Sequence, residues 1–518
     1  MKRGIIRLTA LAAALCMLLP KLPIKASAAM QQIGVRGDVD TDGTVGLSDV
    51  YALLHHLTGE APLTDPDCMQ FADMDQNGRL NAVDLTLLKR LLLSGEEPEK
   101  LYIEVPDPEP ELIDPPIAVV KPTLPCVGEN RIPLFAVDFP DCHFEEQYSA
   151  EQIKQIAFGE PNPSDPYYPL ESISAYYARA SYGRLRMEGD VYLYTAKSNI
   201  QSYYGRTDSL VNEILAAFDD MIDYRNYDIN ENGILDTVIV AVPESALGVD
   251  TDGDGIDDWW PCSGGYYGYR RFDGIVPGNL CIGACSLRKK AIFNNTWVHE
   301  LGHAMGLPDY YKYENTQDGY FGLNGDAGWE MMDDAFGDMS AFSKLMYGWY
   351  DKNEIQIYTG GTQTFTLRSS QDAPGLIVIP RGDLNGYLSE FFTVEYATPT
   401  GNNTAGFYED TRYTLFGTEG VRILHCDSEI AYNGWNLELA WNNYGVYYDS
   451  SNQKQRVLRL VNEKEGGRFF RAGKTVDGSI SGFHWYDDSG WQTVDPGITV
   501  TVDSIADGVC TVTISANG

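Results

Sequence analysis

The segment from His299 to Asp309 constrains the fold of this 518-residue chain more than any other part. His299 and His303 stand four residues apart, so on a helix their imidazoles lie on the same face. Gly306 permits a sharp reversal of the chain, after which Asp309 can return to that face. Two imidazoles and one carboxylate suit a catalytic Zn²⁺ whose fourth position stays open for water. Glu300 lies beside them and can act as a general base.

Two features favour a metal site over a pair of core histidines. The string HExxH alone occurs by chance in ordinary helices. Here two of only 7 histidines lie in it, and glycine and aspartate follow at the extended spacing of the metzincin clan. That clan places a methionine beneath the metal. We expect Met332, in the segment Trp329–Asp333, to be this residue, with an ordinary core methionine as the alternative.

The likeness to known metallopeptidases extends further along the chain. The immune inhibitor A family is similar over residues 299–311, 328–332, 337–344 and 348–349, and also over 135–140, 176–185, 391–396 and 420–427. This resemblance implies a zinc endopeptidase in which His299, His303 and Asp309 hold one zinc and Glu300 is the base. The second donor to the oxyanion stays open between Tyr310, Tyr311 and Tyr347, for each of which core packing is the alternative.

A second constraint is a loop that occurs twice along the chain. Oxygen side chains stand at loop positions 1, 3, 5 and 12, glycine stands at position 6, and position 7 offers a carbonyl, as Ca²⁺ requires. An apolar helix is expected after each loop, over Val50–Leu57 and Leu85–Leu93. The predicted calcium ligands are Asp38, Asp40, Asp42, Thr44 and Asp49 in the first loop, and Asp73, Asp75, Asn77, Arg79 and Asp84 in the second.

These loops resemble the type I dockerin of cellulosomal enzymes, in which position 12 is aspartate and only the exiting helix is kept. The resemblance implies two bound Ca²⁺ ions and the cohesin module of a scaffold protein as the partner. Positions 10 and 11 help to choose the cohesin in that family. They are Leu47 and Ser48 in the first loop but Ala82 and Val83 in the second, which argues against a symmetric binding mode. A structural calcium module without a partner is the alternative.

Composition divides the chain into five parts. A basic start, a short apolar run and small residues predict a secretory signal peptide over 1–29. The dockerin over 34–96 is followed by a linker over 97–125, whose prolines and acids predict an extended segment without a core. We expect a metallopeptidase domain over 126–357 and a β-rich module over 358–518. Alternating residues predict strands of that module at 363–367, 391–396, 498–502 and 509–514.

The predicted fold class is therefore multidomain. It combines a small α dockerin with paired calcium loops, an α/β metzincin-like catalytic domain and a C-terminal all-β sandwich-like module. Two more acidic loops inside the catalytic region lack an acid at position 12, so they are candidate structural calcium sites, with a solvated polar turn as the alternative. Their candidate ligands are Asp228, Asn230, Asn232 and Asp236 in one loop, and Asp250, Asp252 and Asp254 in the other.

Charge and cysteine content limit the partners and the compartment. The net charge of −36 argues against nucleic acid and anionic membranes, and no segment beyond the N-terminus is long and apolar enough to span a membrane. The cysteines that follow the signal peptide permit disulfides in a secreted chain. We favour a Cys126–Cys142 bridge over a Cys126 thiolate that covers the zinc.

The leading hypothesis is a secreted, extracellular zinc endopeptidase that acts on protein or peptide substrates. Its dockerin would attach it to a cohesin-bearing scaffold, as in a cellulosome. One alternative is a non-catalytic adhesion or recognition module carried by the dockerin, but the intact motif argues against it because such a module has no need of Glu300. A polysaccharide-acting enzyme is the third hypothesis, and the sequence offers no paired-carboxylate signature for it.

Overall fold

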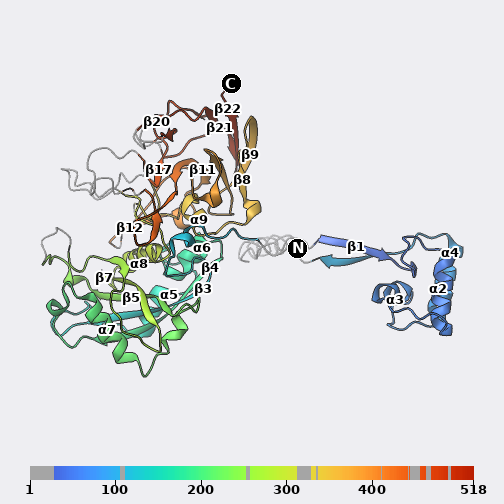
Figure 1. Cartoon of the computed structure of the whole chain (residues 1–518), viewed down its shortest axis with the longest axis horizontal. Helices are drawn as coiled ribbons and strands as arrows, with labels where there is room; N and C mark the ends of the chain where they lie inside the picture. The colour runs from blue at the N-terminus through green and yellow to red at the C-terminus, as the bar shows by residue number, and fades with distance from the viewer. Residues whose placement is uncertain are drawn as a thin grey trace, which may run out of the picture. The chain divides into compact units, whose positions relative to one another are not determined.

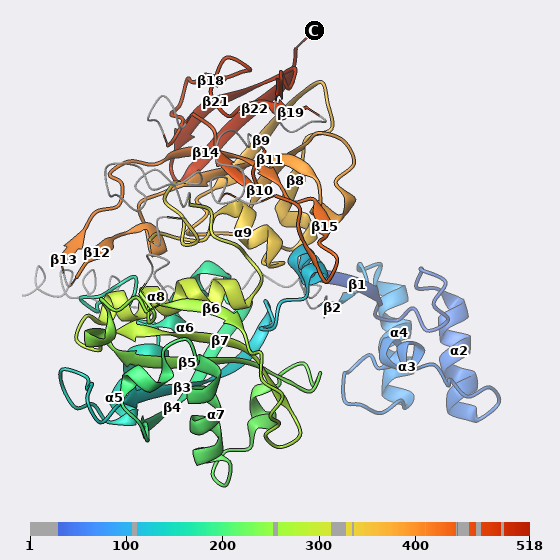
Figure 2. The same cartoon turned by 60° about the vertical axis from the view of Figure 1, so that its left-hand side comes forward.

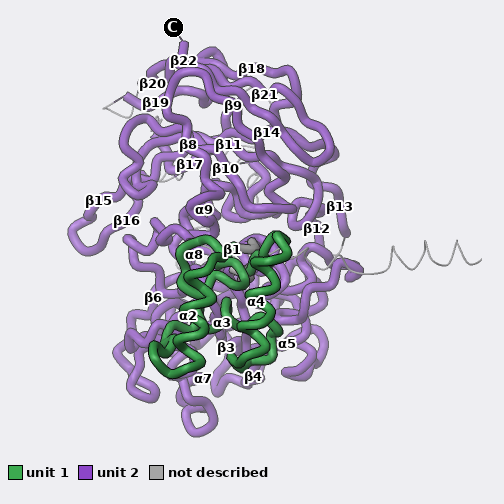
Figure 3. Tube along the Cα trace, turned by 90° about the vertical axis from the view of Figure 1, so that its right-hand side faces the viewer, with its two compact units in different colours: residues 1–110 green, residues 111–518 purple. Residues whose placement is uncertain are grey.

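The chain folds into two compact units, residues 1–110 and 111–518 (Figure 3). The computed structural model describes residues 29–105, 111–251, 257–311, 328–333, 336–409, 411–441, 443, 455–462, 468–487 and 492–517. Residues 1–28 of the expected signal peptide, and also Asp252 and Asp254, lie outside the described residues. None of the described helices has the length and apolar character needed to cross a lipid bilayer.

The small unit contains the two expected loop helices. Each helix begins at position 10 of its loop and ends at a glycine in the left-handed conformation, Gly59 or Gly95, which stops the helix without steric cost. Leu53 and Leu88 are fully buried where the two helices meet. A two-stranded antiparallel sheet pairs the start of the unit with its end. Its elements are β1 (Ala29–Val35), α2 (Leu47–Thr58), α3 (Pro66–Ala72), α4 (Ala82–Ser94) and β2 (Lys100–Val105).

A five-stranded sheet forms the first layer of the larger unit, in the order β4-β3-β5-β7-β6 (Figures 1 and 2). Its pairings are parallel except for the edge strand β6, which runs antiparallel to β7. From Val238 to Pro243, β5 is an apolar run whose residues are all buried, as expected for a strand covered on both faces. Its strands are β3 (Gly128–Asp138), β4 (Leu185–Thr195), β5 (Ile234–Pro243), β6 (Cys262–Gly265) and β7 (Val276–Cys285).

Helices cover both faces of this sheet. Alternate residues of β3 divide between two cores: Leu134 packs with the helices of one face, and Phe135 packs with the helix of the other. The first face carries α5 (Ala150–Phe158), α6 (Ile173–Ala180) and α8 (Lys290–Ala304), and the second carries α7 (Thr207–Phe218). The metal motif lies on α8, between this sheet and the C-terminal strands (Figure 2).

Two more sheets follow in the C-terminal half. One has the order β17-β14-β11-β10-β8 and the other has the order β18-β21-β22-β9. The strands expected from alternation are present as β9, β11, β21 and β22. Their bounds are β8 (Ile355–Ile357), β9 (Thr362–Arg368), β10 (Leu376–Pro380), β11 (Glu390–Ala397), β14 (Gly420–Asp427), β17 (Leu458–Leu460), β18 (Thr475–Val476), β21 (Ile498–Ala506) and β22 (Val509–Ala516).

The expected boundary between residues 357 and 358 does not separate compact units. β11 and β14 are buried along their whole length. Phe391 belongs to the core that contains α8, and its neighbour Phe392 belongs to the core shared with the four-stranded sheet. The middle sheet therefore has no solvent-facing side in these strands, and residues 111–518 form one unit.

The predicted linker also differs from the structure. β2 pairs with β1 inside the small unit, and the segment from residue 111 onward is part of the larger unit. Ile117 and Leu124 are fully buried among its prolines, and Leu124 donates its N–H to the Ala304 carbonyl at 3.1 Å. The prediction from composition was wrong for this segment, because a few apolar residues between prolines are enough to dock it on an existing core.

Candidate metal centre and calcium loops

Helix α8 and the turn after it bring the predicted metal ligands together. The imidazoles of His299 and His303 lie one turn apart, with ring centroids separated by 4.8 Å. The helix ends at Met305, and Gly306 follows in the left-handed region at φ 105°. A Cβ at Gly306 would lie 2.8 Å from Ile117, so both backbone conformation and space require glycine. The reversal returns Asp309 to the histidines.

Three acceptor atoms converge at this point. Asp309 Oδ1 lies 3.0 Å from His299 Nε2 and 3.2 Å from His303 Nε2. His299 Nδ1 lies 2.9 Å from the Met331 carbonyl oxygen, and His303 Nδ1 lies 2.7 Å from the Leu307 carbonyl oxygen. Carbonyls only accept hydrogen bonds, so each imidazole carries a proton on Nδ1. Burial lowers the pKa of both rings, but hydrogen bonding to Asp309 and the charge of Glu300 raise it, to about 9 for His299, and a metal ion would take the place of the Nε2 protons.

This donor set fits a divalent metal ion. Two imidazole nitrogens stand 3.0 and 3.2 Å from one carboxylate oxygen, and a divalent cation can replace the Nε2 protons that otherwise hold the three groups together. His299, Asp309 and Glu300 are buried, with 8%, 4% and 6% of their surfaces exposed. Burial alone would raise the pKa of Asp309, but the adjoining imidazoles hold it well below its usual range. Asp309 is therefore ionised over the whole physiological range.

Glu300 stands beside the ligands with different electrostatics. Burial raises the pKa of its carboxyl, and the charges of His299 and His303 offset only part of that rise. A carboxylate with a raised pKa is a stronger proton acceptor, as a general base must be. Position and basicity both make Glu300 suited to proton transfer at this centre.

The segment 328–333 forms the floor of the centre. The Met331 carbonyl orients His299, and the Met332 carbonyl accepts the N–H of Tyr310 at 2.7 Å. Met332 is fully buried, and its sulfur lies 2.4 Å from the place where a Cβ on Gly302 would be. The Met332 side chain therefore packs against α8 at Gly302, and its place beneath a bound metal stays a prediction.

Sequence reasoning missed the groups that hold this floor. Glu330 is fully buried, and its carboxylate accepts hydrogen bonds from the Ser343 hydroxyl at 2.6 Å and the Ser340 N–H at 3.0 Å. From β14, Arg422 donates to the Trp329 carbonyl at 2.5 Å and to Glu395 of β11 at 2.7 Å. The signal was available, because Glu395 and Arg422 are charged residues whose chain neighbours on the strands are mostly apolar.

The structure separates the three tyrosines that had been left open as oxyanion donors. Tyr310 and Tyr347 are fully buried, and their hydroxyls bond to Ser343 at 3.2 Å and to the Gly302 carbonyl at 2.8 Å. Both are structural residues, which confirms the core-packing alternative for them. Tyr311 is partly exposed and stacks on His299, with ring centroids 6.3 Å apart. Tyr311 is thus the remaining candidate of the three.

The two loops of the small unit share one hydrogen-bond pattern. The position-1 carboxylates of Asp38 and Asp73 each accept the N–H groups of positions 5 and 6. The position-12 carboxylates of Asp49 and Asp84 each accept the N–H groups of positions 2, 3 and 9. Carboxylate oxygens come together in two groups that can hold a cation: Asp38, Asp40 and Asp49, and Asp73, Asp75 and Asp84.

The remaining predicted loop residues lie around these groups. Asp42 accepts the N–H of Thr44 at 2.8 Å, and Asn77 accepts the N–H of Arg79 at 2.9 Å, which fixes positions 5 to 7 in both loops. At position 10, Leu47 leaves 72% of its surface exposed, and at position 11 Val83 leaves 50% exposed. Ser48 and Ala82 are also exposed. Both helix starts therefore present apolar groups to solvent.

One of the two extra loops is gathered around its acids. Asp228 accepts the N–H groups of Asn232 and Gly233, both at 2.9 Å, and Asp236 accepts the N–H of Ile229 at 3.1 Å. Asn230 accepts the Asn232 N–H at 3.2 Å. In the other loop Asp250 is exposed, and its expected companions Asp252 and Asp254 are not described.

The cysteines differ from expectation. All eight cysteines after Cys16 are free thiols in the described residues, including Cys126 and Cys142. Cys126 donates to the Met305 carbonyl at 3.4 Å, and Cys142 lies 3.3 Å from the Ser245 hydroxyl oxygen. Burial raises the pKa of the Cys126 thiol strongly, so Cys126 is a neutral core group. Neither the bridge to Cys142 nor a Cys126 thiolate over the metal is present.

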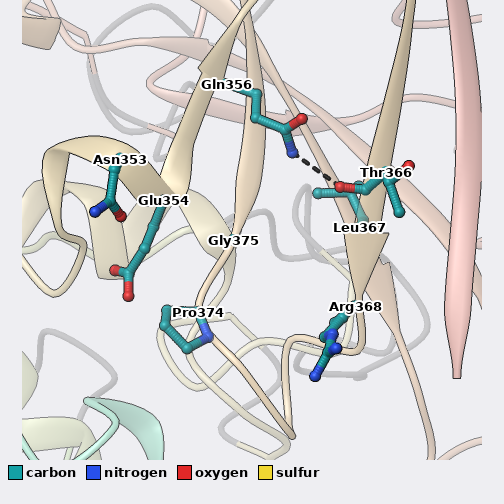
Figure 4. Close-up of a pocket in the computed structure, with 8 residues that line it drawn as sticks. All are labelled: Asn353, Glu354, Gln356, Thr366, Leu367, Arg368, Pro374 and Gly375. Carbon is teal, nitrogen blue, oxygen red and sulfur yellow. Dashed lines mark hydrogen bonds between the residues drawn. The ribbon is translucent and has the colours of Figure 1, made fainter. Parts of the chain in front are cut away.

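A small pocket lies away from the metal centre, between β8 and β9 (Figure 4). Its lining includes Glu354, whose carboxylate is bound by Arg184 at 2.9 Å, and Gln356, which donates to the Thr366 carbonyl at 2.9 Å. The pocket contains none of the predicted ligands. Two of its polar side chains, Glu354 and Gln356, thus already have hydrogen-bond partners.

Comparison with known proteins agrees with this division. The family model described as the dockerin type I domain matches residues 36–93, and the model described as Peptidase M66 matches residues 277–366. The second match includes α8, Asp309 and the floor segment. No curated protein matches the chain. The two family matches support a peptidase that can bind cohesin, whereas the likeness to the immune inhibitor A family stays a prediction of the sequence.

Proposed function

We propose that this protein is a secreted, zinc-dependent endopeptidase that a calcium-loaded dockerin attaches to a cohesin-bearing scaffold. One observation carries the proposal. The Nε2 atoms of His299 and His303 lie 3.0 and 3.2 Å from Asp309 Oδ1, and both Nδ1 atoms face backbone carbonyls. Such a set has nitrogen and oxygen ligands in the number that catalytic zinc uses.

The reaction follows from the groups around this set. When bound, zinc supplies a Lewis acid that polarises a carbonyl and lowers the pKa of a water molecule. Glu300 accepts the proton of the attacking water on its carboxylate and passes it to the leaving amine. The two histidines stay fixed during this transfer because their Nδ1 atoms bond to backbone carbonyls. Tyr311, which stacks on His299, would donate to the oxyanion.

An extended peptide fits the edge of the first sheet. β6 is the last strand of that sheet and packs beside α8. Backbone at a strand edge can pair with an extended chain, and side-chain pockets then select its residues. The positions Gly264 and Gly265 leave open space where a side chain would stand. We infer that the substrate lies along β6, with its scissile bond at Glu300.

The small unit supplies the attachment. The exposed Leu47 and Val83 stand at the starts of α2 and α4, each next to a calcium loop that fixes the helix start. The apolar surface of these residues supports a protein partner, and the resemblance to dockerins identifies it as cohesin. Because the neighbouring residues Ser48 and Ala82 differ, we infer that the two helix starts bind with unequal affinity.

Replacing Glu300 tests the catalytic part of the proposal. Glu300→Gln keeps the size of the side chain but removes the base, so casein cleavage should fall by about 10²- to 10⁴-fold. Zinc content should stay at the wild-type level because Glu300 is not a ligand. Glu244→Gln, a surface change near the start of α8, is the matched control and should keep full activity. Wild-type cleavage by Glu300→Gln would refute the mechanism.

Two binding experiments distinguish the alternatives. A peptidyl hydroxamate should bind the zinc-loaded chain tightly if the centre is catalytic, and it should not bind a recognition module. Calorimetry against a panel of cohesins, with and without EDTA, tests the attachment. Binding that persists in EDTA, or binding to none of the panel, would contradict the dockerin assignment.

A further inference from the structure

The loop at residues 228–236 repeats the hydrogen bonds of the two dockerin loops in a different unit of the chain. Its first carboxylate, on Asp228, accepts the N–H groups of positions 5 and 6, as Asp38 and Asp73 do. Its fifth residue, Asn232, accepts the position-7 N–H at 2.8 Å, and Asp42 accepts the corresponding N–H at the same distance. The backbone of the three loops is thus organised in the same way.

The second carboxylate comes from an unexpected position. In the dockerin loops position 12 accepts the N–H of position 2, but here Asp236 at position 9 does so, at 3.1 Å. The difference follows from the element that comes next. The dockerin loops run into helices, whereas this loop runs into β5. A strand rises about 3.3 Å per residue and a helix about 1.5 Å, so an extended chain brings a carboxylate to the loop in fewer residues.

Asp236 provides an independent sign of a missing partner. Only 1% of its surface is exposed, and its Oδ2 is directed into the loop by the bond to Ile229. Among the described residues, its Oδ1 has no hydrogen-bond partner. Burial raises the pKa of Asp236 to about 7, and the nearby charge of Asp228 adds to that rise. Two adjacent carboxylates, one of them buried with an unsatisfied oxygen, are stable together when a cation lies between them.

We propose that this loop is a third calcium site, built into the larger unit and separate from the dockerin. The ligands are the side-chain oxygens of Asp228, Asn230, Asn232 and Asp236, with the backbone carbonyl of Ile234. Such a set of hard oxygen donors suits Ca²⁺ and not Zn²⁺. The site lies at the start of β5, which pairs with β3 and β7 in the centre of the first sheet. Calcium therefore stabilises the unit that carries the metal centre.

Calcium content of the full chain tests the site directly. Bound calcium per chain would be measured by equilibrium dialysis and elemental analysis, at constant zinc, for the wild type and three variants. Asp236→Asn and Asn230→Ala should each lower the content by one ion, and the dockerin loops should keep theirs. Glu231→Gln is the matched control, because Glu231 is an exposed acid of the same loop and is not a proposed ligand. It should lose no calcium.

Thermal unfolding of the larger unit provides a second readout. A substitution that only disturbed the fold would not reverse the order of the melting temperatures when calcium is added. In calcium-free buffer Asp236→Asn should melt above the wild type, because it removes the repulsion between two carboxylates. In millimolar calcium the order should reverse. Equal calcium content in the wild type and both ligand variants would overturn the proposal. So would an equal loss in Glu231→Gln, or a melting temperature of the larger wild-type unit that does not respond to calcium.

Discussion

Gly302→Ala probes the contact between the metal helix and the methionine beneath it. A Cβ at Gly302 would lie 2.4 Å from Met332 Sδ, 3.1 Å from Met332 Cε and 3.4 Å from the Tyr347 hydroxyl oxygen. Favourable contacts between such atoms need about 3.5–4.0 Å. The sulfur or the helix must therefore move by about 1 Å, in a core where Met332 and Tyr347 have no exposed surface.

The expected loss in unfolding free energy can be estimated from this steric overlap. Overpacking a dense core destabilises by about 1–3 kcal/mol, and the better helix propensity of alanine returns up to about 1 kcal/mol. We expect a net loss of about 1–2 kcal/mol in the unfolding free energy of the larger unit. Movement of α8 also displaces His299 and His303, so zinc affinity should fall by about 10- to 100-fold, as when groups that support a metal ligand are disturbed.

A double-mutant cycle identifies the contact. Met332→Ala alone leaves a cavity and should cost about 2–5 kcal/mol, but in the double variant the new methyl at residue 302 enters that cavity. The two changes should therefore be non-additive, with a coupling of about 0.5–3 kcal/mol. Guanidinium unfolding and a chelator competition for zinc measure both effects. Gly264→Ala is the control, because nothing lies within 4 Å of a Cβ there. Additive effects, or wild-type stability in Gly302→Ala, would refute the reasoning.

Three further predictions address other parts of the larger unit. Tyr311→Phe should lower kcat on casein by about 10- to 100-fold at unchanged zinc content if Tyr311 donates to the oxyanion; an unchanged kcat would remove it from the mechanism. Arg422→Met should lower the unfolding free energy by about 3–5 kcal/mol, because Glu395 is left buried and unpaired. Adding Glu395→Gln should recover part of that loss. Equal stability of the wild type and Arg422→Met would contradict this prediction. Burial raises the pKa of Asp427 to about 7, so the folded chain holds a proton that the unfolded chain releases near pH 4. The melting temperature should therefore fall as the pH rises towards and through 7. Asp427→Asn should flatten that slope, and an identical slope in the variant would exclude Asp427 as its source.

The sequence was sufficient to predict the geometry formed by residues that lie close together in the chain. A separation of four residues on a helix places His299 and His303 on one face whatever surrounds them, and a glycine in the left-handed region returns Asp309 to them. The carboxylate groups of the two small-unit loops were predictable for the same reason, since each group lies within twelve consecutive residues whose backbone conformation is set by turns and glycines. These sites depend on contacts between near neighbours in the chain, so local spacing specifies them.

The tertiary structure decided everything that depends on contacts between distant segments. Spacing did not reveal that β11 and β14 are buried on both faces, or that Leu124, between prolines, docks on the end of α8. Arg422 reaches the Trp329 carbonyl across 93 residues of sequence. Such pairs form only when whole elements pack together, and the free energy of that packing is spread over many side chains. The sequence determined which residues can hold the metal, and the packing of three sheets determined what holds those residues in place.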